Sequence, residues 1–354
     1  MIRHALPEDA RPGDDTSWFG RYSPFIQSET RRQIAWKRRQ WPELPDGEHV
    51  KNPGHFYPHL LPATHADLNL FPPVRDQVLD YIRDEQIERH VEAPNLRSSQ
   101  VSCFNFLFPL RLDLDTARTV LAPLLPDLAE VRAIEFEVTG GPSATRHLGE
   151  PPGGKRGANA TSIDATIDWL DGRARRRLTL LEWKYTEETY GGCGGYASKG
   201  NPDRTTCERL DPRYPRSAAA DCYLASGGST RLRRRYWELV RPEWIAALAS
   251  VPGCPFRGPL YQLLRQELLA DWLRASGQYD IVDVAAVHFR ANAALRANPP
   301  HLAGLGASVG DVWRAAVPGG LREVEIEHLV AAWDAAPRER LPGWREYLRD
   351  RYGL

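Results

Sequence analysis

The sequence predicts an α/β protein in which helices flank a central sheet. Two observations indicate strands: a pair of strand-like runs joined by an Asp-Gly turn within residues 162–187, and a β-branched run over residues 280–289. A third observation indicates a covering helix, because leucines recur with helical spacing over residues 260–273. At 354 residues, with 42% hydrophobic and 26% charged residues, the chain can bury a core of this kind.

Residues 1–96 are predicted to form an N-terminal extension of helices and irregular segments. Residues 1 to about 72 are rich in proline, aromatic residues and arginine and show little periodicity. One helix is expected over residues 28–40, with Ser28 as its N-cap, and a second over residues 73–91.

Residues 98–110, SSQVSCFNFLFPL, form a nearly continuous apolar segment that fits a buried helix. The helix is predicted to begin at Ser98 and to stop at Pro109, because proline lacks the N–H that a helix interior needs. Its polar residues are Gln100 and Asn105, and it contains no acidic residue.

A first strand is predicted over residues 131–139, where Ile134, Phe136 and Val138 alternate with two glutamates. If this strand pairs antiparallel with the next one, its far end lies near Asp164. Glu137 is therefore a candidate for an acidic residue at that end. A solvent-facing strand residue is the alternative interpretation.

Residues 162–187 contain the two runs that dominate the sequence. Asp171 and Gly172 signal a hairpin, and a loop of about four to six residues would place Asp164 opposite Glu182. Glu182 and Lys184 share one face of the second strand, because side chains alternate with a period of two. Two carboxylates and a lysine would then converge at one end of the sheet.

Two carboxylates beside a lysine suit a hard divalent cation such as Mg²⁺, which prefers oxygen ligands and keeps several waters. Asp164 and Glu182 are the candidate metal ligands, and Lys184 is placed to hold or deprotonate an attacking water. This set is typical of metal-assisted phosphodiester hydrolysis. A structural ion pair between Glu182 and Lys184 is the alternative, because ion-pair networks also gather charges.

Asp164, followed eighteen residues later by Glu182-Trp183-Lys184, resembles the D…(D/E)xK core of the PD-(D/E)xK nuclease superfamily. Similarity to a bacterial restriction endonuclease-like group covers about residues 97–300. It includes the stretches RGANATSIDATI, LLEWKYTE, SSQVSCFNFLFPL and PLYQLLRQELLADWL. The resemblance implies a restriction-endonuclease-like core, with a mixed sheet and the order helix, three strands, helix, strand (αβββαβ).

The resemblance also implies a site. Mg²⁺, or Mn²⁺ in its place, would be held by Asp164, Glu182 and the backbone carbonyl of Trp183. The superfamily commonly places an acidic residue on the helix before the sheet; residues 98–110 have none, so Glu137 is the candidate replacement. It often uses a glutamine on the helix after the third strand, and Gln262 is the candidate there.

The segment that follows the hairpin, residues 188–258, is predicted to interrupt the core as an irregular insertion of about seventy residues. Their four cysteines raise the question of structural zinc. The spacings are wide and no CxxC pair occurs, which favours buried free thiols and leaves zinc as the alternative. The cysteines are Cys193, Cys207, Cys222 and Cys254.

The chain is expected to divide into the extension 1–96, a nuclease-like core 97–300 that contains the insertion 188–258, and a helical segment 301–354 packed on the core. Helices are predicted over residues 322–333 and 344–352. No apolar run reaches membrane-spanning length, no signal-peptide core is present, and no P-loop pattern occurs. A cytoplasmic location is expected.

The first hypothesis is a Mg²⁺-dependent DNA endonuclease, with double-stranded DNA as substrate, a restriction or defence role and a possible homodimer. Arginines cluster over residues 31–39, 173–177 and 231–235, where they could contact phosphates or form a solvated face. The second hypothesis is a catalytically inactive nucleic-acid-binding protein on the same fold. The third, a sugar hydrolase using Asp164 and Glu182 as acid and base, ranks last because it does not call for Lys184.

Overall fold

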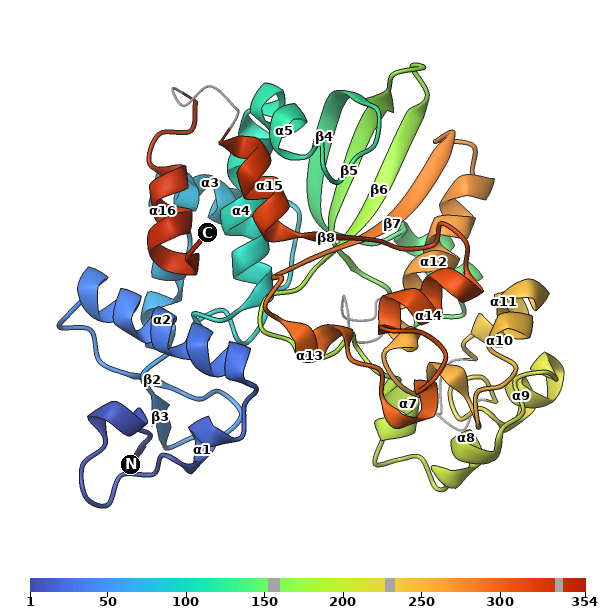
Figure 1. The fold of residues 1–354 in the computed structure, drawn as a ribbon, viewed down its shortest axis with the longest axis horizontal. Helices are drawn as coiled ribbons and strands as arrows, with labels where there is room; N and C mark the ends of the chain where they lie inside the picture. Colours follow the sequence, from blue (N-terminus) through green and yellow to red (C-terminus); the bar gives the residue numbers. More distant parts are fainter. Residues whose placement is uncertain (152–159, 227–232, 335–339) are drawn as a thin grey trace.

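The computed structural model describes residues 1–151, 160–226, 233–334 and 340–354. Its centre is a five-stranded mixed sheet in the order β4-β5-β6-β7-β8. The helices α4, Ser99–Leu112, and α12, Leu260–Ala275, lie on opposite faces of this sheet (Figure 1). The predicted α/β class is confirmed. The strands are β4 Leu128–Val138, β5 Ile163–Asp171, β6 Arg176–Trp183, β7 Ile281–His288 and β8 Arg322–Glu325.

β5 and β6 form the predicted antiparallel hairpin, with residues 172–175 as the loop. The Asp171 carboxylate holds the loop by accepting N–H bonds from Arg173 and Arg175 at 3.0 and 3.1 Å. The register pairs Ala165 with Leu181. One further step along each strand sets Asp164 opposite Glu182, as the sequence predicts.

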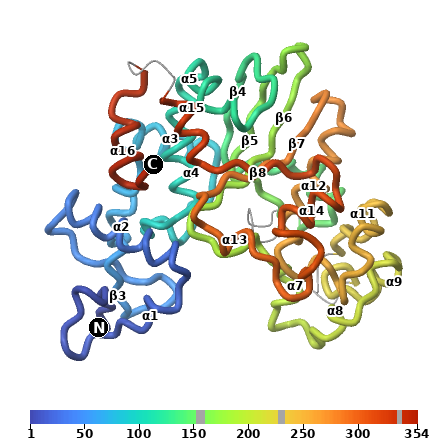
Figure 2. Tube along the Cα trace, viewed as in Figure 1, coloured from blue at the N-terminus to red at the C-terminus, as the bar shows by residue number. Residues whose placement is uncertain are grey.

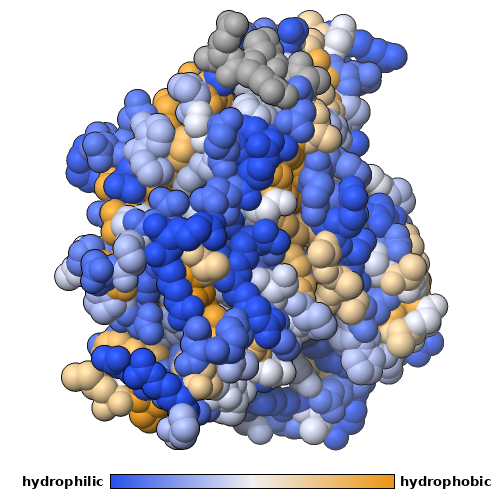
Figure 3. Space-filling view, turned by 60° about the vertical axis from the view of Figure 1, so that its left-hand side comes forward, coloured by the Kyte–Doolittle hydropathy of each residue, from blue (hydrophilic) through white to orange (hydrophobic). Residues whose placement is uncertain are grey.

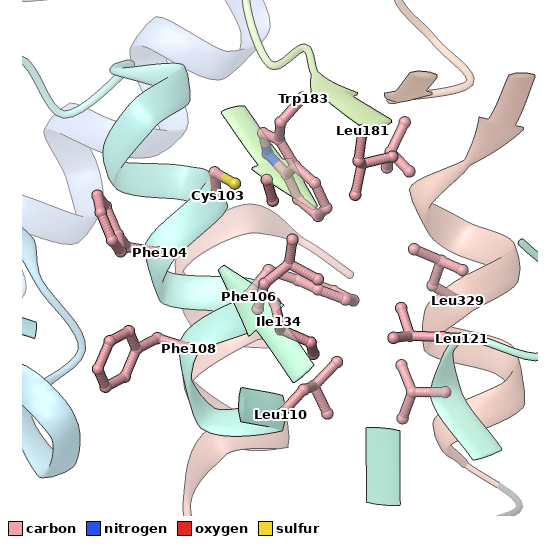
Figure 4. Close-up of a cluster of buried hydrophobic side chains, with 14 of the residues drawn as sticks. Cys103, Phe104, Phe106, Phe108, Leu110, Leu121, Ile134, Leu181, Trp183 and Leu329 are labelled. Carbon is pink, nitrogen blue, oxygen red and sulfur yellow. The ribbon is translucent and has the colours of Figure 1, made fainter. Parts of the chain in front are cut away.

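One face of the sheet packs on α4, which spans Ser99–Leu112. Figure 4 shows Phe106 of this helix meeting Ile134 of β4 and Trp183 of β6 in a buried cluster. The Trp183 indole N–H also donates to Ser102 Oγ at 3.1 Å. Alternate residues of β6 therefore serve the core on this face and leave the opposite face to Glu182 and its neighbours.

The other face packs on α12, Leu260–Ala275. Leu260, Leu264 and Leu268 lie in one buried cluster with Leu180 of β6, confirming the leucine stripe. Since α12 covers the face that carries Glu182, its polar residues near the strand ends are brought against that carboxylate.

Pro109 lies inside α4, so the prediction that the helix stops at this proline is wrong. A proline within a helix leaves the carbonyl four residues earlier without its N–H partner. Here that carbonyl belongs to Asn105, and it accepts a hydrogen bond of 2.9 Å from Trp344 Nε1. The helix continues because a side chain from a distant part of the chain supplies the missing donor. Ser98 is the N-cap, and the helix begins at Ser99, one residue after the predicted start.

The predicted helix over residues 322–333 is wrong for its first four residues. They form β8, which pairs parallel with β7 and aligns Val324 with Val287. The helix that follows, α15, spans Ile326–Trp333. β8 is a fifth strand beyond the four that the αβββαβ order implies. The last predicted helix is confirmed as α16, Trp344–Tyr352.

α2 spans Pro24–Gln40 and begins earlier than predicted. Its N-cap is Ser23, whose hydroxyl accepts the Ile26 N–H at 3.5 Å, so the assignment of Ser28 as N-cap is wrong. Proline at the first helical position favours this start, because its missing N–H is unpaired there in any case.

α3 spans Arg75–Asp84 and does not extend to residue 91 as predicted, because the backbone turns at Gln86, where φ is 51°. The N-terminal part also forms a small sheet in the order β1-β3-β2 that periodicity did not reveal. Its strands are too short to show alternation; they are β1 Ile2–Arg3, β2 Gly47–Glu48 and β3 His55–Tyr57.

Figure 2 shows the last helix, α16, lying beside α2 of the N-terminal part. The fully buried Arg351 joins them: its Nε donates to Gln33 Oε1 at 3.2 Å, and its Nη1 donates to the Asn69 carbonyl at 2.6 Å. The two ends of the described chain therefore share one packed region.

The described residues of the insertion form short helices and irregular segments. All of its cysteines are free thiols, and three of them, Cys193, Cys222 and Cys254, line one small cavity. Cys254 N–H also donates to the Cys207 carbonyl at 2.7 Å. The helices are α7 Gly194–Ala197, α8 Thr205–Arg209, α9 Pro215–Asp221, α10 Tyr236–Leu239 and α11 Pro242–Ala247.

The remaining helices are short connectors. No helix among the described residues is long and apolar enough to cross a membrane. Hydrophilic side chains cover most of the face in Figure 3, with hydrophobic ones scattered among them. The α-helices are α1 Ser17–Gly20, α5 Leu114–Val120, α6 Gly141–His147, α13 Ala293–Arg296 and α14 Val309–Ala316. The 3₁₀ turns are Pro7–Asp9, Ala63–Asn69, Pro72–Val74, Pro255–Arg257 and Pro300–Leu302.

Candidate active site

One cavity of about 580 Å³ lies at the ends of β4, β5 and β6. Every candidate site residue of the sequence analysis lines it. Two of them come from neighbouring strands, one from the end of β4, two from the chain beyond Glu182, and one from α12. They are Glu137, Asp164, Glu182, Trp183, Lys184 and Gln262.

Asp164 is fixed by the neighbouring strand: the Trp183 backbone N–H donates to its Oδ2 at 2.8 Å. Burial raises the pKa of Asp164 well above its usual range, and the negative charges of Glu182 and Glu137 raise it further, while Lys184 opposes the change. The site therefore concentrates negative charge where little solvent can screen it.

Glu182 is only 2% exposed, and both of its carboxylate oxygens are engaged. Lys184 Nζ lies 2.7 Å from Oε1, which also accepts a 2.5 Å bond from Gln262 Nε2. Gln266 Nε2 donates to Oε2. The carboxylate is thus held in one orientation by three donors from two elements.

Lys184 is buried, with 7% of its surface exposed. Burial alone would lower its pKa, but the carboxylates of Glu182, Glu187 and Asp164 outweigh it, and the pKa of Lys184 is raised. The side chain is therefore an ammonium that donates hydrogen bonds within the site.

Glu137 enters the cavity because the backbone turns at the end of β4, where its φ of 50° lies in the left-handed region that glutamate rarely adopts. Its carboxylate accepts from Gln100 Nε2 at 2.7 Å and from Ser162 Oγ at 3.1 Å. Such strained residues concentrate at functional sites. The interpretation of Glu137 as a solvent-facing strand residue is wrong, since it is 6% exposed.

The two glutamines of α12 differ in one respect. Gln262 Oε1 accepts the Gly191 N–H at 2.7 Å, whereas Gln266 Oε1 is buried and meets no donor. Gln266 was not among the site residues predicted from the sequence. Its spacing of four residues from Gln262 places both on one face of a helix, and that signal could have found it.

The N-terminal part supplies one wall of the cavity, which the sequence analysis did not predict. Lys51 and residues 88–92 line it, and Lys51 Nζ lies 3.2 Å from Glu92 Oε1. The His90 N–H donates at 3.1 Å to Gln100, the residue that holds Glu137. These contacts span segments far apart in sequence, so no local pattern reveals them.

The arginine cluster at 173–177 lies at the opposite end of β5 and β6 from Asp164 and Glu182. Arg176 and Arg177 each lie 2.6 Å from an acidic partner, Asp168 and Asp283. Arginines of the 31–39 cluster are also ion-paired. Residues 231 and 232 of the third cluster lie outside the described residues.

The residues at the site fit a divalent cation. Asp164 and Glu182 are carboxylates whose mutual repulsion a cation would relieve, and the buried carbonyl oxygen of Gln266 meets no donor. Among the described residues, no group of three or more His, Cys, Asp or Glu side chains forms a metal centre. The fit therefore rests on two carboxylates completed by neutral oxygens.

A family described as restriction endonuclease associating with ARP matches the chain over residues 31–353. The match spans α4, the hairpin with its carboxylates, α12 and the whole of α16. It also includes the N-terminal wall of the cavity. No curated protein and no solved structure matches the chain.

Proposed function

The chain belongs to the family of the restriction endonuclease associating with ARP, and from this we propose that it is a Mg²⁺-dependent endonuclease hydrolysing phosphodiester bonds of DNA. One observation carries the proposal. Asp164, Glu182 and Lys184 converge in a single cavity at the sheet end, with the carboxylates on the neighbouring strands β5 and β6 and the ammonium on the residue that follows β6.

Asp164, Glu182 and the Trp183 carbonyl would hold Mg²⁺, or Mn²⁺ in its place. The bound ion would supply positive charge to the phosphate and lower the pKa of water. Asp164 is positioned by the Trp183 N–H, and Glu182 by Gln262 and Gln266. The chain thus fixes both carboxylates before any substrate arrives, which reduces the reorganisation that the reaction requires.

Lys184 would orient the attacking water and stabilise negative charge that develops near it. Its ammonium already lies beside Glu182, and its burial keeps competing solvent away. Glu137, held by Gln100, would be the acidic residue that the superfamily commonly carries on the preceding helix.

The proposed substrate is double-stranded DNA, in a restriction or defence role within the cytoplasm. The cavity extends from the carboxylates to the N-terminal wall. Lys51 and Arg89 line that wall in ion pairs with Glu92 and Asp67, and they would exchange these partners for the phosphate backbone of a bound duplex. A homodimer would bring two such cavities to the two strands of a duplex.

A second candidate is a catalytically inactive nucleic-acid-binding protein on the same fold. It is favoured by the engagement of both Glu182 oxygens with Lys184, Gln262 and Gln266, an arrangement that also serves a closed structural network. This candidate predicts DNA binding without hydrolysis under every metal condition.

The test is incubation of supercoiled plasmid with purified protein in Mg²⁺, Mn²⁺ or EDTA, beside a Lys184→Ala control. Nicking or linearisation that requires the metal and is lost in the control supports the endonuclease. Binding in a gel-shift assay, without cleavage in either metal, identifies the inactive alternative.

A further inference from the structure

Gln266 carries a buried oxygen that the site does not use. The residue lies on α12, is 2% exposed and lines the cavity that holds the carboxylates. Its Nε2 donates to Glu182 Oε2, while its Oε1 meets no hydrogen-bond donor among the described residues. Buried carbonyl oxygens nearly always have a partner, because losing hydration without replacement is unfavourable.

The position of this oxygen follows from its amide. Oε1 and Nε2 are bonded to the same carbon, and Nε2 contacts Glu182, so Oε1 must lie close to that carboxylate. Glu182 and Asp164 are opposite each other on β6 and β5. The unused oxygen therefore lies where the negative charge of the site is concentrated.

Gln262 provides an internal comparison on the same helix. It too donates through Nε2 to Glu182, at 2.5 Å, but its Oε1 is satisfied by the Gly191 N–H at 2.7 Å. Both glutamines orient Glu182, and they differ in whether the carbonyl oxygen is already occupied. Orienting Glu182 alone would not require an oxygen without a donor.

We infer that Gln266, through Oε1, is a further ligand of the divalent cation that Asp164 and Glu182 hold. The inference rests on the proposed function and adds a neutral oxygen to its two carboxylates. Carbonyl and carboxylate oxygens are the donors that Mg²⁺ and Mn²⁺ favour. A neutral third ligand also adds no repulsion to a site that is already crowded with negative charge.

Mn²⁺ affinity of the DNA-free protein tests this directly, by electron paramagnetic resonance or calorimetry. Gln266→Ala and Gln262→Ala each remove one donor to Glu182, but only Gln266→Ala removes the proposed ligand. We expect Gln266→Ala to weaken Mn²⁺ binding at least ~10-fold more than Gln262→Ala does. Melting curves in EDTA establish that each variant is folded. If Gln266→Ala does not fold, the Mn²⁺ titration is done with Gln266→Asn, whose shorter side chain withdraws the amide by one methylene.

Glutamate variants of the same two residues should change the Mn²⁺ affinity in the opposite direction at Gln266. Gln266→Glu puts a carboxylate at the cation and should tighten Mn²⁺ binding, whereas Gln262→Glu faces the Gly191 N–H and should not. Equal losses in the two alanine variants would show that Gln266 only orients Glu182 and would overturn the inference alone. Wild-type protein that binds no Mn²⁺ would overturn it together with the metal-dependent function.

Discussion

The Trp183 backbone N–H donates a hydrogen bond of 2.8 Å to the Asp164 carboxylate, so the end of one strand is fastened by the side chain of its neighbour. The bond lies between Glu182 and Lys184 in sequence. It therefore sets the positions of both residues relative to Asp164, and any change at Asp164 has structural as well as chemical consequences.

Asp164→Asn should stabilise the metal-free protein while abolishing cleavage. The asparagine oxygen can still accept the Trp183 N–H, and the substitution removes a charge that burial and Glu182 disfavour. We expect the free energy of unfolding in EDTA to rise by on the order of 1 kcal/mol. Asp168→Asn is the matched control on the same strand. It breaks the 2.6 Å ion pair with Arg176 and should not raise the free energy of unfolding. A destabilised Asp164→Asn variant would contradict the charge argument.

Lys184→Ala should lower cleavage by at least ~100-fold and leave Mn²⁺ binding largely intact, because the ligands are neighbouring oxygens. Lys184→Arg should also fail, since a planar guanidinium does not replace a compact ammonium in a buried position. Plasmid cleavage, Mn²⁺ titration and thermal melts on both variants check this. If Lys184 only pairs with Glu182, alanine would instead destabilise the fold and arginine would partly rescue it.

Glu137→Gln should reduce cleavage by ~10–100-fold. The contact of 2.7 Å between Gln100 Nε2 and Glu137 Oε1 allows a sharper test. In the double variant Gln100→Glu, Glu137→Gln the carboxylate and the amide exchange places within the same cavity. We expect the double variant to recover part of the lost rate in a plasmid-nicking assay. If a well-folded double variant recovers none of the cleavage rate, the carboxylate must lie at the end of β4.

His59 should make the protein less stable in acid. Burial, and then the nearby charge of Arg97, hold the pKa of His59 well below its usual range. A histidine with a lowered folded pKa gives stability that is present above its unfolded pKa of about 6.5 and lost as the pH falls toward the folded value. The loss is about 1.4 kcal/mol for each pH unit over which only the unfolded chain binds the proton.

The variant His59→Gln keeps an acceptor for Arg97, whose Nη2 lies 3.0 Å from His59 Nε2, but cannot be protonated. Melting temperatures of this variant between pH 7.5 and 5 should therefore fall less steeply than those of the wild type. His65→Gln, at an exposed position, is the control and should follow the wild type. Identical slopes for all three proteins would refute the assignment.

The insertion cysteines are expected to be free thiols without stoichiometric zinc. Metal analysis of the purified protein, with a thiol titration after unfolding, checks this. All five cysteines should react without prior reduction, consistent with the free thiols of the structure. One equivalent of zinc, released as the thiols react, would establish the alternative.

The local part of the site could be predicted from the sequence because a hairpin is a local structure. The Asp171-Gly172 turn and the period-two alternation fix the register of β5 and β6, and the register places Asp164 opposite Glu182. The helix α12 could be predicted equally well, since its leucines repeat every four residues.

The parts of the fold and of the site that were not predicted depend on contacts that no local sequence pattern encodes. The helix α4 continues through Pro109 only because Trp344 supplies a donor to Asn105. β8 is a strand because β7 offers an edge to pair with. The N-terminal wall reaches Glu137 through His90 and Gln100.

The bond between Trp344 and Asn105 has a consequence for biosynthesis. A nascent chain leaves the ribosome from its N-terminus, so α4 emerges long before the indole that completes it, and Asn69 long before Arg351. Until residues 344–352 appear, α4 has an uncompensated carbonyl at its proline and an uncovered apolar surface. Final folding should therefore wait until residues 344–352 have been synthesised, and ribosome-bound chains that lack these residues should be the ones that chaperones and proteases recognise.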